Sequence, residues 1–179
     1  MLKEAVQGLK INSDGIYVDV TFGGGGHSRE ILSHLSPDGK LFAFDQDQSA
    51  FANKLEDHRF QLIKGNFADS KRHLKFYGIT SVDGILADFG VSSHQFDSGE
   101  RGFSTRYEGL LDMRMDHSGQ LDASQVVNEY TLENLRMVLS QYGELRNTHK
   151  LSAAIVKEWK DDTITTTQAL VAILTPSIP

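Results

Sequence analysis

The strongest constraint on the fold is a regular alternation of short apolar runs and amphipathic segments in the first half of the chain. Four runs have the length and residue types of buried strands: GIYVDV (15–20), KLFAFD (40–45), FQLIKG (60–65) and VDGILADFG (82–90). Segments with helical spacing of apolar residues separate them, at 29–35, 48–57 and 68–78. Strands that are apolar throughout are typical of parallel sheets, whose two faces are both covered. The sequence therefore predicts an α/β fold with a parallel sheet and helices on both faces.

The second half of the chain lacks the alternation of strands and helices and has a different residue pattern. Residues 94–120 are polar and rich in glycine but carry large apolar side chains, which indicates an ordered loop. Helical segments follow at 122–130, 131–143, 149–160 and 165–176. Asp122 and Gln125 have the spacing of a capping box, and one helix has an apolar stripe made by Leu132, Leu135, Leu139 and Tyr142. We expect an α/β core over residues 1–105 and a small all-helical domain over residues 106–179.

Composition limits the class of protein. A chain of 179 residues with 39% hydrophobic content is ordinary for one globular domain, or for one domain with an insertion. The chain contains no run of about 18 apolar residues, so no membrane span is predicted. The first residues lack the apolar core of a secretory signal. The chain has no cysteine, which excludes disulfides, thiolate nucleophiles and cysteine zinc sites. We expect a cytoplasmic protein that does not bind a membrane.

Charge and histidine content limit the partners. A formal net charge of −6 argues against a protein that coats nucleic acid by bulk attraction. Contact with RNA would then use local patches such as KRHLK (71–75), Arg101 or Arg106, although such a cluster is more often a solvated helix face. The seven histidines are scattered without a pair at i, i+4 spacing, so we expect no metal site.

Four consecutive glycines, Gly23–Gly26, follow the first predicted strand and precede a helical segment. A glycine inside a regular element costs about 0.5–1 kcal/mol against alanine, so a run of four needs a reason. Ligands of parallel α/β sheets bind beyond the carboxyl ends of the strands. We therefore interpret the run as a backbone surface that a cofactor approaches closely, in preference to a mobile loop.

Two aspartates indicate the kind of cofactor. Asp45 ends the second strand, twenty residues beyond Gly25, where an acid accepts the hydroxyls of a ribose. The pattern Gly23-x-Gly25-x-x-Ser28 is close to the dinucleotide fingerprint but lacks its third glycine. Asp19, just ahead of the glycines, would repel a pyrophosphate but could hold the cationic amine of S-adenosylmethionine. These residues favour a methyltransferase, and a nicotinamide-dependent oxidoreductase stays open as the alternative.

Asp88 is the candidate catalytic residue. It lies in ADFGVSSHQFD (87–97), at the carboxyl end of the fourth predicted strand. An acceptor there can orient the lone pair of an exocyclic base amine and stabilise the positive charge that develops on attack. A structural role as a turn cap is the alternative. Asp88-Phe89-Gly90 copies the kinase magnesium motif, but the chain lacks the other kinase motifs.

Several long segments carry a family resemblance. They are DVTFGGGGHS (19–28), AFDQD (43–47), DGILADFGVSSHQFDSGERGFS (83–104), GLLDMRMD (109–116) and YGELRNTHKLSAAIV (142–156). Together they resemble the bacterial 16S ribosomal RNA cytosine-N4 methyltransferases of the MraW type, and the likeness extends over essentially the whole chain. It implies methylation of the N4 amine of a cytidine in 16S rRNA of the small ribosomal subunit, with S-adenosylmethionine as donor.

The resemblance also assigns residues. It implies that Gly25, Gly26 and His27 contact the cofactor, that Asp45 binds its ribose, and that Phe67 lies near the adenine. Asp88 and Gln95 would complete the pocket. With Gly23 and Asp19 from the glycine pattern, these residues form the predicted cofactor site. The helical segment after residue 105 resembles the family's inserted domain, which engages the RNA.

The resemblance sets an expectation about completeness. It implies a Rossmann-like class I methyltransferase sheet, of which this chain carries the amino-terminal strands, plus a small all-helical inserted domain. The family begins with a short stretch that precedes MLKEAV, and it continues beyond TPSIP with further strands and active-site residues. We therefore expect a chain truncated at its carboxyl end, with strand 82–90 as an exposed edge. A non-catalytic fragment that binds cofactor or RNA is the alternative, and a homodimer is an open possibility.

Overall fold

The computed structural model describes residues 1–97, 99–160 and 162–177. The chain divides into two compact units, Met1–Ser92 and Ser93–Pro179. This division lies after Ser92, and the domain boundary predicted after residue 105 stays a prediction. The assignment of the two parts to cofactor binding and RNA recognition stays a prediction.

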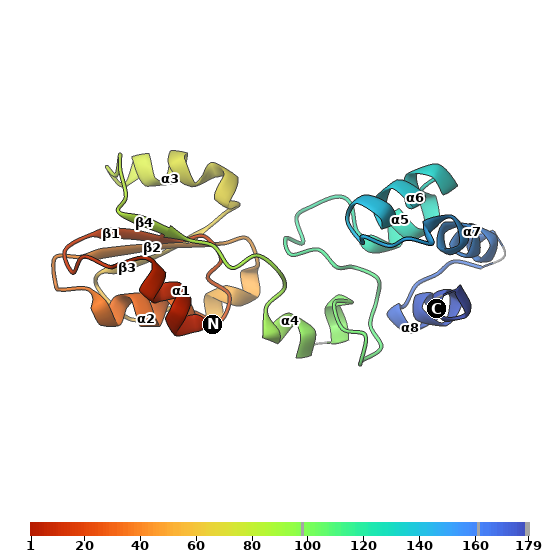
Figure 1. The fold of residues 1–179 in the computed structure, drawn as a ribbon, viewed down its shortest axis with the longest axis horizontal. Helices are drawn as coiled ribbons and strands as arrows, with labels where there is room; N and C mark the ends of the chain where they lie inside the picture. The colour runs from red at the N-terminus through yellow and green to blue at the C-terminus, as the bar shows by residue number, and fades with distance from the viewer. Residues whose placement is uncertain (98, 161, 178–179) are drawn as a thin grey trace. The chain divides into compact units, whose positions relative to one another are not determined.

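The first unit is built on a four-stranded sheet (Figure 1). Its strands are β1 (Ile16–Asp19), β2 (Lys40–Asp45), β3 (Phe60–Lys64) and β4 (Gly84–Leu86), in the order β3-β2-β1-β4. All neighbours are parallel, and Val18 of β1 stands opposite Phe42 of β2 on one side and Ile85 of β4 on the other. The four predicted strands and the Rossmann-like α/β class are confirmed.

Helices cover both faces of this sheet (Figure 1). On one face, α1 (Leu2–Gly8) and α2 (Gly26–His34) pack on the strands through Val6, Ile31 and Leu32. On the other face, Leu74 of α3 (Ser70–Phe76) joins a second cluster of strand residues. The strands are apolar throughout because they supply residues to both clusters.

The segment between β2 and β3 corrects one prediction. The helix expected over residues 48–57 is a short 3₁₀ helix, η1 (Gln48–Asn53), whose cap residue Asp47 accepts a hydrogen bond from the Ser49 amide. Lys54 has left the helical conformation, and Nδ2 of the Asn53 side chain donates to the Gly23 carbonyl at 3.2 Å. This long-range side-chain contact ties the end of η1 to the glycine run, and no local sequence pattern predicts it. A second 3₁₀ turn, η2 (Phe67–Asp69), leads into α3.

The second unit contains the predicted helices. They are α5 (Ala123–Glu129), α6 (Leu132–Gln141), α7 (Thr148–Trp159) and α8 (Thr167–Leu174). The unit also contains three short elements that were not predicted: α4 (Ser93–Asp97), η3 (Gly99–Arg101) and η4 (Thr175–Ser177). Their core contains Leu111, Val127, Leu135, Ile155 and Ile164. Across residues 1–97, 99–160 and 162–177, no helix is both long and apolar enough to cross a bilayer.

The two local predictions for this unit, a capping box and an apolar stripe, have different outcomes. The capping box of α5 is confirmed, with the Gln125 amide donating to Asp122 at 2.8 Å and the Asp122 amide donating to Gln125 at 3.1 Å. The stripe on α6 is only half buried, because Leu135 and Leu139 pack in the core whereas Leu132 and Tyr142 are exposed. The two exposed residues stand at the ends of the helix, beyond the part that contacts the core.

The short strand β4 forms one end of the sheet in the part of the chain that the structure describes. The predicted strand 82–90 is reduced to Gly84–Leu86, and Ile85 is 58% exposed. The expected edge position is confirmed, and residues 87–92 leave the sheet without regular secondary structure.

A matched pair of substitutions tests the hydrophobic core of the first unit. Ile31 is fully buried under the sheet, whereas Ile85 is more than half exposed. Ile31→Ala should lower the free energy of unfolding by about 2–5 kcal/mol, because it leaves a cavity. Ile85→Ala should cost less than about 1 kcal/mol. Urea unfolding followed by far-ultraviolet circular dichroism measures both, and equal losses would contradict the placement of Ile31 in the core.

Candidate functional site

Three aspartates and the glycine run share one edge of the first unit. Asp19 is the last residue of β1, Asp45 is the last residue of β2, and Asp88 follows the end of β4. Because these strands are parallel neighbours, their carboxyl ends meet, as in other α/β proteins that bind ligands at this edge. The predicted grouping of these residues is therefore present in the fold.

The glycine run is an ordered turn. Gly23 and Gly25 have left-handed backbone angles, with φ of +50° and +74°. A Cβ atom on Gly25 would lie 2.9 Å from the Phe22 ring, so a larger residue does not fit without displacement. Gly24 has open space around it and is exposed. The run thus presents exposed backbone at Gly24, whose carbonyl accepts a hydrogen bond from the Arg29 side chain at 2.9 Å.

Helix α2 begins directly after this turn, with Gly25 as its cap and Gly26 as its first residue. The amide groups of a first helical turn have no acceptor within the helix and carry the positive end of its dipole. His27 and Ser28 lie in this turn. The start of α2 therefore suits a negatively charged group, such as the carboxylate of an amino acid.

Asp45 holds the glycine run to the end of β2. One of its carboxylate oxygens accepts a hydrogen bond from the Gly23 amide at 2.8 Å, and the other accepts from the Asp47 amide at 2.8 Å. The side chain is partly exposed. Its position agrees with binding of a ribose, and that role stays a prediction.

Asp19 is completely buried beneath the same turn. Its Oδ2 accepts a hydrogen bond from the Ser28 hydroxyl at 2.8 Å, and its Oδ1 accepts from the Thr21 amide at 3.1 Å. Burial raises the pKa of the Asp19 carboxyl, while the hydrogen bonds from Ser28 and Thr21 act in the opposite direction. The expected contact of Asp19 with a cofactor amine stays a prediction, and the carboxylate has a structural use that the sequence reading did not include.

Asp88 is held by its backbone and keeps its side chain exposed. Its amide donates a hydrogen bond to Thr21 Oγ1 at 2.8 Å, and 68% of its side chain is accessible to solvent. Its Oδ2 lies 3.8 Å from Nδ1 of the largely buried His27. The structure thus brings together two predicted site residues from β4 and α2.

Two exposed aromatic rings add an apolar surface to this unit. Phe67 in η2 and Phe89 after β4 are 42% and 72% exposed, and their ring centroids are 5.6 Å apart. Phe67 was predicted to lie near an adenine, whereas Phe89 was overlooked because its only sequence signal was the kinase-like triplet. Exposed aromatic pairs of this kind suit a flat ring ligand.

Gln95 lies in the second unit, in α4, and is 5% exposed. Its place in the cofactor pocket stays a prediction.

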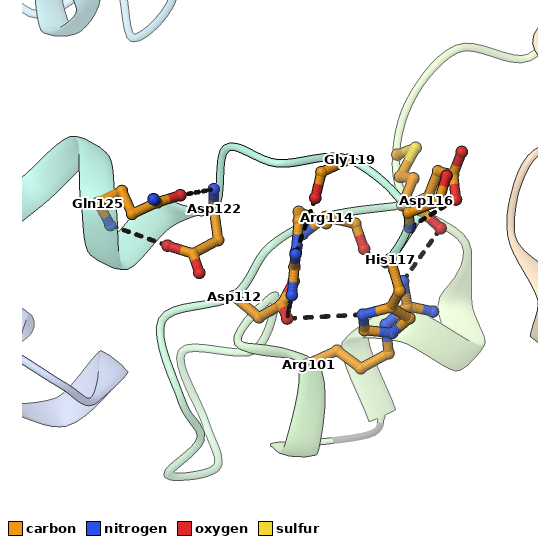
Figure 2. A network of polar contacts seen from close by, with 10 residues as sticks. Arg101, Asp112, Arg114, Asp116, His117, Gly119, Asp122 and Gln125 are labelled. Atoms are coloured by element: carbon orange, nitrogen blue, oxygen red, sulfur yellow. Dashed lines mark hydrogen bonds and ion pairs between the residues drawn. The ribbon is translucent and has the colours of Figure 1, made fainter.

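A network of polar contacts orders the loop before α5 (Figure 2). Arg114 donates two hydrogen bonds to the Asp112 carboxylate, at 2.9 and 2.7 Å, and His117 Nδ1 lies 3.5 Å from the same carboxylate. Arg114 also donates to the Gly119 carbonyl at 2.9 Å. These contacts lower the pKa of Asp112 to about 2, chiefly through the hydrogen bonds from Arg114. The predicted ordered loop is confirmed.

The basic residues considered for RNA contact differ in their surroundings. Arg101 donates to the backbone carbonyls of Arg114 and Met115 and lies 5.6 Å from the centre of the Phe103 ring. Arg106 is exposed. In α3 the exposed basic side chains are Lys71, Arg72 and Lys75. Arg101 therefore orders the loop, and an RNA contact by any of these residues stays a prediction.

Some histidines lie close to carboxylates, a feature that the absence of histidine pairs at i, i+4 spacing did not address. His34 Nε2 lies 3.5 Å from Glu30 within α2, and His117 pairs with Asp112. Among the described residues, no group of three or more histidine, aspartate or glutamate side chains is arranged to hold a metal ion.

Replacement of Asp112 tests the loop network. A carboxylate whose pKa falls to about 2 on folding stabilises the folded state above its ordinary pKa, and this contribution disappears as the pH falls through 2. Asp112→Asn should therefore cost about 2 kcal/mol at pH 7 and progressively less between about pH 5 and pH 2. The fluorescence of Trp159, the single tryptophan and a residue packed on this core, reports urea unfolding of the second unit. A loss that is the same at pH 7 and pH 3, or a matching effect of Glu108→Gln at an exposed site, would contradict the network's role.

Comparisons with known proteins agree with the resemblance seen in the sequence. The MraW methylase family matches residues 1–179. A protein of Christiangramia forsetii named ribosomal RNA small subunit methyltransferase H is 57% identical over 98% of this chain and 58% of its own length. The protein of the same name from Flavobacterium psychrophilum is 56% identical over all of this chain and 62% of its own length. The chain thus spans about three fifths of the length of these relatives.

Likeness to solved structures is weaker. A crystal structure from Anabaena variabilis, described as a methyltransferase of an antibiotic biosynthesis pathway, has a TM-score of 0.38 and 14% identity over 81% of this chain and 61% of its own. The fold assignment therefore rests on the strand order and the covered sheet, and the family rests on the sequence match. By that match, the chain belongs to the MraW methylase family.

Proposed function

We propose that this chain carries the S-adenosylmethionine site of an enzyme that methylates the N4 amine of a cytidine in 16S rRNA of the small ribosomal subunit. Membership of the MraW methylase family supports the reaction class, and relatives named for the small subunit support the RNA. The observation that carries the proposal is the joining of Asp45 and Asp88 to one glycine turn, through Gly23 and Thr21. Because the chain covers about three fifths of its relatives, the activity is proposed for the whole protein.

The residues at this edge fit S-adenosylmethionine. When bound, it supplies an electrophilic methyl group on a positively charged sulfonium. The open backbone at Gly24 and the start of α2 would bind its amino-acid carboxylate, and Asp45 would accept the ribose hydroxyls. Phe67 and Phe89 offer an apolar surface to the adenine. Carboxylates at this edge favour a cation and disfavour the pyrophosphate of a nicotinamide cofactor.

Asp88 would act on the target amine. Its exposed carboxylate accepts a hydrogen bond from N4, turns the lone pair of the nitrogen out of conjugation with the ring, and stabilises the positive charge that forms during attack. As the bond from N4 to the methyl carbon forms and the bond from sulfur breaks, N4 loses a proton to this carboxylate or to water. The cytosine must leave its stack to reach such a group.

The remaining proposals concern the RNA partner, the cofactor pocket and the cellular location. Residues 106–179 would recognise the RNA, Gln95 would complete the cofactor pocket, and the protein would act in the cytoplasm, where ribosomal subunits are assembled. A homodimer stays a possibility. The exposed basic side chains of α3 and Arg106 are the candidates for phosphate contact in the two units.

Calorimetric titration with S-adenosylhomocysteine tests the cofactor assignment. The chain should bind this compound and not NADH. Asp45→Ala should weaken binding about 10–100-fold, because a carboxylate hydrogen bond to a hydroxyl is lost. Asp38→Ala, at an exposed turn residue, is the control and should leave binding unchanged. Tight binding of NADH would favour the oxidoreductase, and full affinity in Asp45→Ala would remove the ribose assignment.

Methyl transfer to small ribosomal subunits tests the role of Asp88. Asp88→Ala should keep its affinity for S-adenosylhomocysteine within about threefold and lose transfer by at least about 100-fold. The assay is run with this chain and with a version extended to the length of its relatives. Transfer by the extended version alone would identify the 179-residue chain as a binding fragment. Normal transfer by Asp88→Ala in the extended version would overturn the catalytic assignment.

A further inference from the structure

Thr21 connects two aspartates that lie far apart in the sequence. It stands between the end of β1 and the glycine run, and its backbone amide donates to Asp19 Oδ1 at 3.1 Å. Its side-chain hydroxyl accepts a hydrogen bond from the Asp88 amide at 2.8 Å and lies 3.5 Å from the same Asp19 oxygen. Thr21 is not among the site residues that the sequence predicted.

We propose that Thr21 is a positioning residue that sets the place of the Asp88 carboxylate relative to the glycine turn. The inference rests on the proposed function, in which Asp88 accepts a hydrogen bond from the target amine. Thr21 itself would touch neither the cofactor nor the base. Thr21 is held by buried Asp19, and its hydroxyl in turn holds the backbone of Asp88.

The need for such a residue comes from the short strand β4. The last hydrogen bond between β1 and the end of β4 runs from the Val20 amide to the Leu86 carbonyl, at 2.9 Å. Beyond Leu86 the chain leaves the sheet, and at Gly90 it adopts a φ of +142°. The hydrogen bond to Thr21 therefore extends the attachment of this segment by two residues, up to Asp88.

Thr21 is itself held in place by Asp19 and by its own side-chain shape. Asp19 is fully buried and accepts hydrogen bonds from Ser28 in α2 and from Thr21. Thr21 is β-branched, which restricts rotation about its χ1 angle. His27, the neighbour of Ser28, approaches Asp88 from α2 at 3.8 Å. The contacts form a closed ring from α2 through β1 to the segment after β4, in which the Thr21 hydroxyl binds the backbone of Asp88 and His27 approaches its carboxylate.

The position of Asp88 matters because proton transfer and hydrogen bonding to a reacting amine need heavy atoms about 2.6–3.2 Å apart. A displacement of about 1 Å can lower a rate about 100-fold. A residue that fixes the backbone of Asp88 should therefore change the rate of transfer while leaving the affinity for the cofactor nearly intact.

Two substitutions at Thr21 make a matched test in the extended protein. Thr21→Val keeps the shape and loses the hydroxyl, and Thr21→Ser keeps the hydroxyl. We expect Thr21→Val to lower kcat about 10–100-fold with the affinity for S-adenosylhomocysteine within about threefold, and Thr21→Ser to stay within about threefold of the unsubstituted protein in both. Hydrogen exchange of the Asp88 amide, followed by NMR, should be faster in Thr21→Val and unchanged in Thr21→Ser.

The outcomes separate the inference from the function on which it rests. Unchanged kcat in Thr21→Val, in a protein where Asp88→Ala abolishes transfer, would overturn the role of Thr21 alone. Equal protection of the Asp88 amide in both variants would overturn it as well. Equal losses of kcat, cofactor affinity and melting temperature in Thr21→Val would show a general structural role instead. Normal transfer by Asp88→Ala would overturn the proposed mechanism itself.

Discussion

The buried carboxylate of Asp19 is the interaction on which the edge of the sheet depends. A charged or polar group buried without hydrogen-bond partners destabilises a protein, so Asp19 is compatible with the fold only if its partners are in place. Ser28 and the Thr21 amide are those partners. They fix the start of α2 and Thr21, two positions before the glycine run, and thereby restrict the turn between them.

The same arrangement separates structural from exposed groups at the edge. The buried residues that contact or precede the turn are Asp19, Phe22 and Ser28. The exposed residues, which follow the carboxyl ends of β3 and β4, are Phe67, Asp88 and Phe89. Asp45 belongs to both groups, since it holds Gly23 and is partly accessible. Hydrogen bonds within the protein therefore position Asp45 and the backbone of Asp88 at this edge.

Much of the fold was predictable because local patterns reflect burial directly. Strands buried on both faces must be apolar throughout, and the α5 capping box needs only residues three positions apart. The predictions that were wrong concern segments whose structure depends on distant partners. The helix expected over 48–57 ends early, with Asn53 bonded to Gly23, and the stripe on α6 is buried only where the core reaches it.

The sequence alone determined the class of the sheet, the place of the glycine turn, and the identity of the acids around it. These follow from periodicity and from the residue types that a tight turn requires, together with the positions of the acids at the ends of the strands. Only the tertiary structure decided which groups those acids contact. Thr21 and Asp88 are 67 residues apart, and Phe67 and Phe89 come from separate connections. Contacts of that kind arise when parallel strands align their ends, and no pattern within one segment encodes which side chains will then meet.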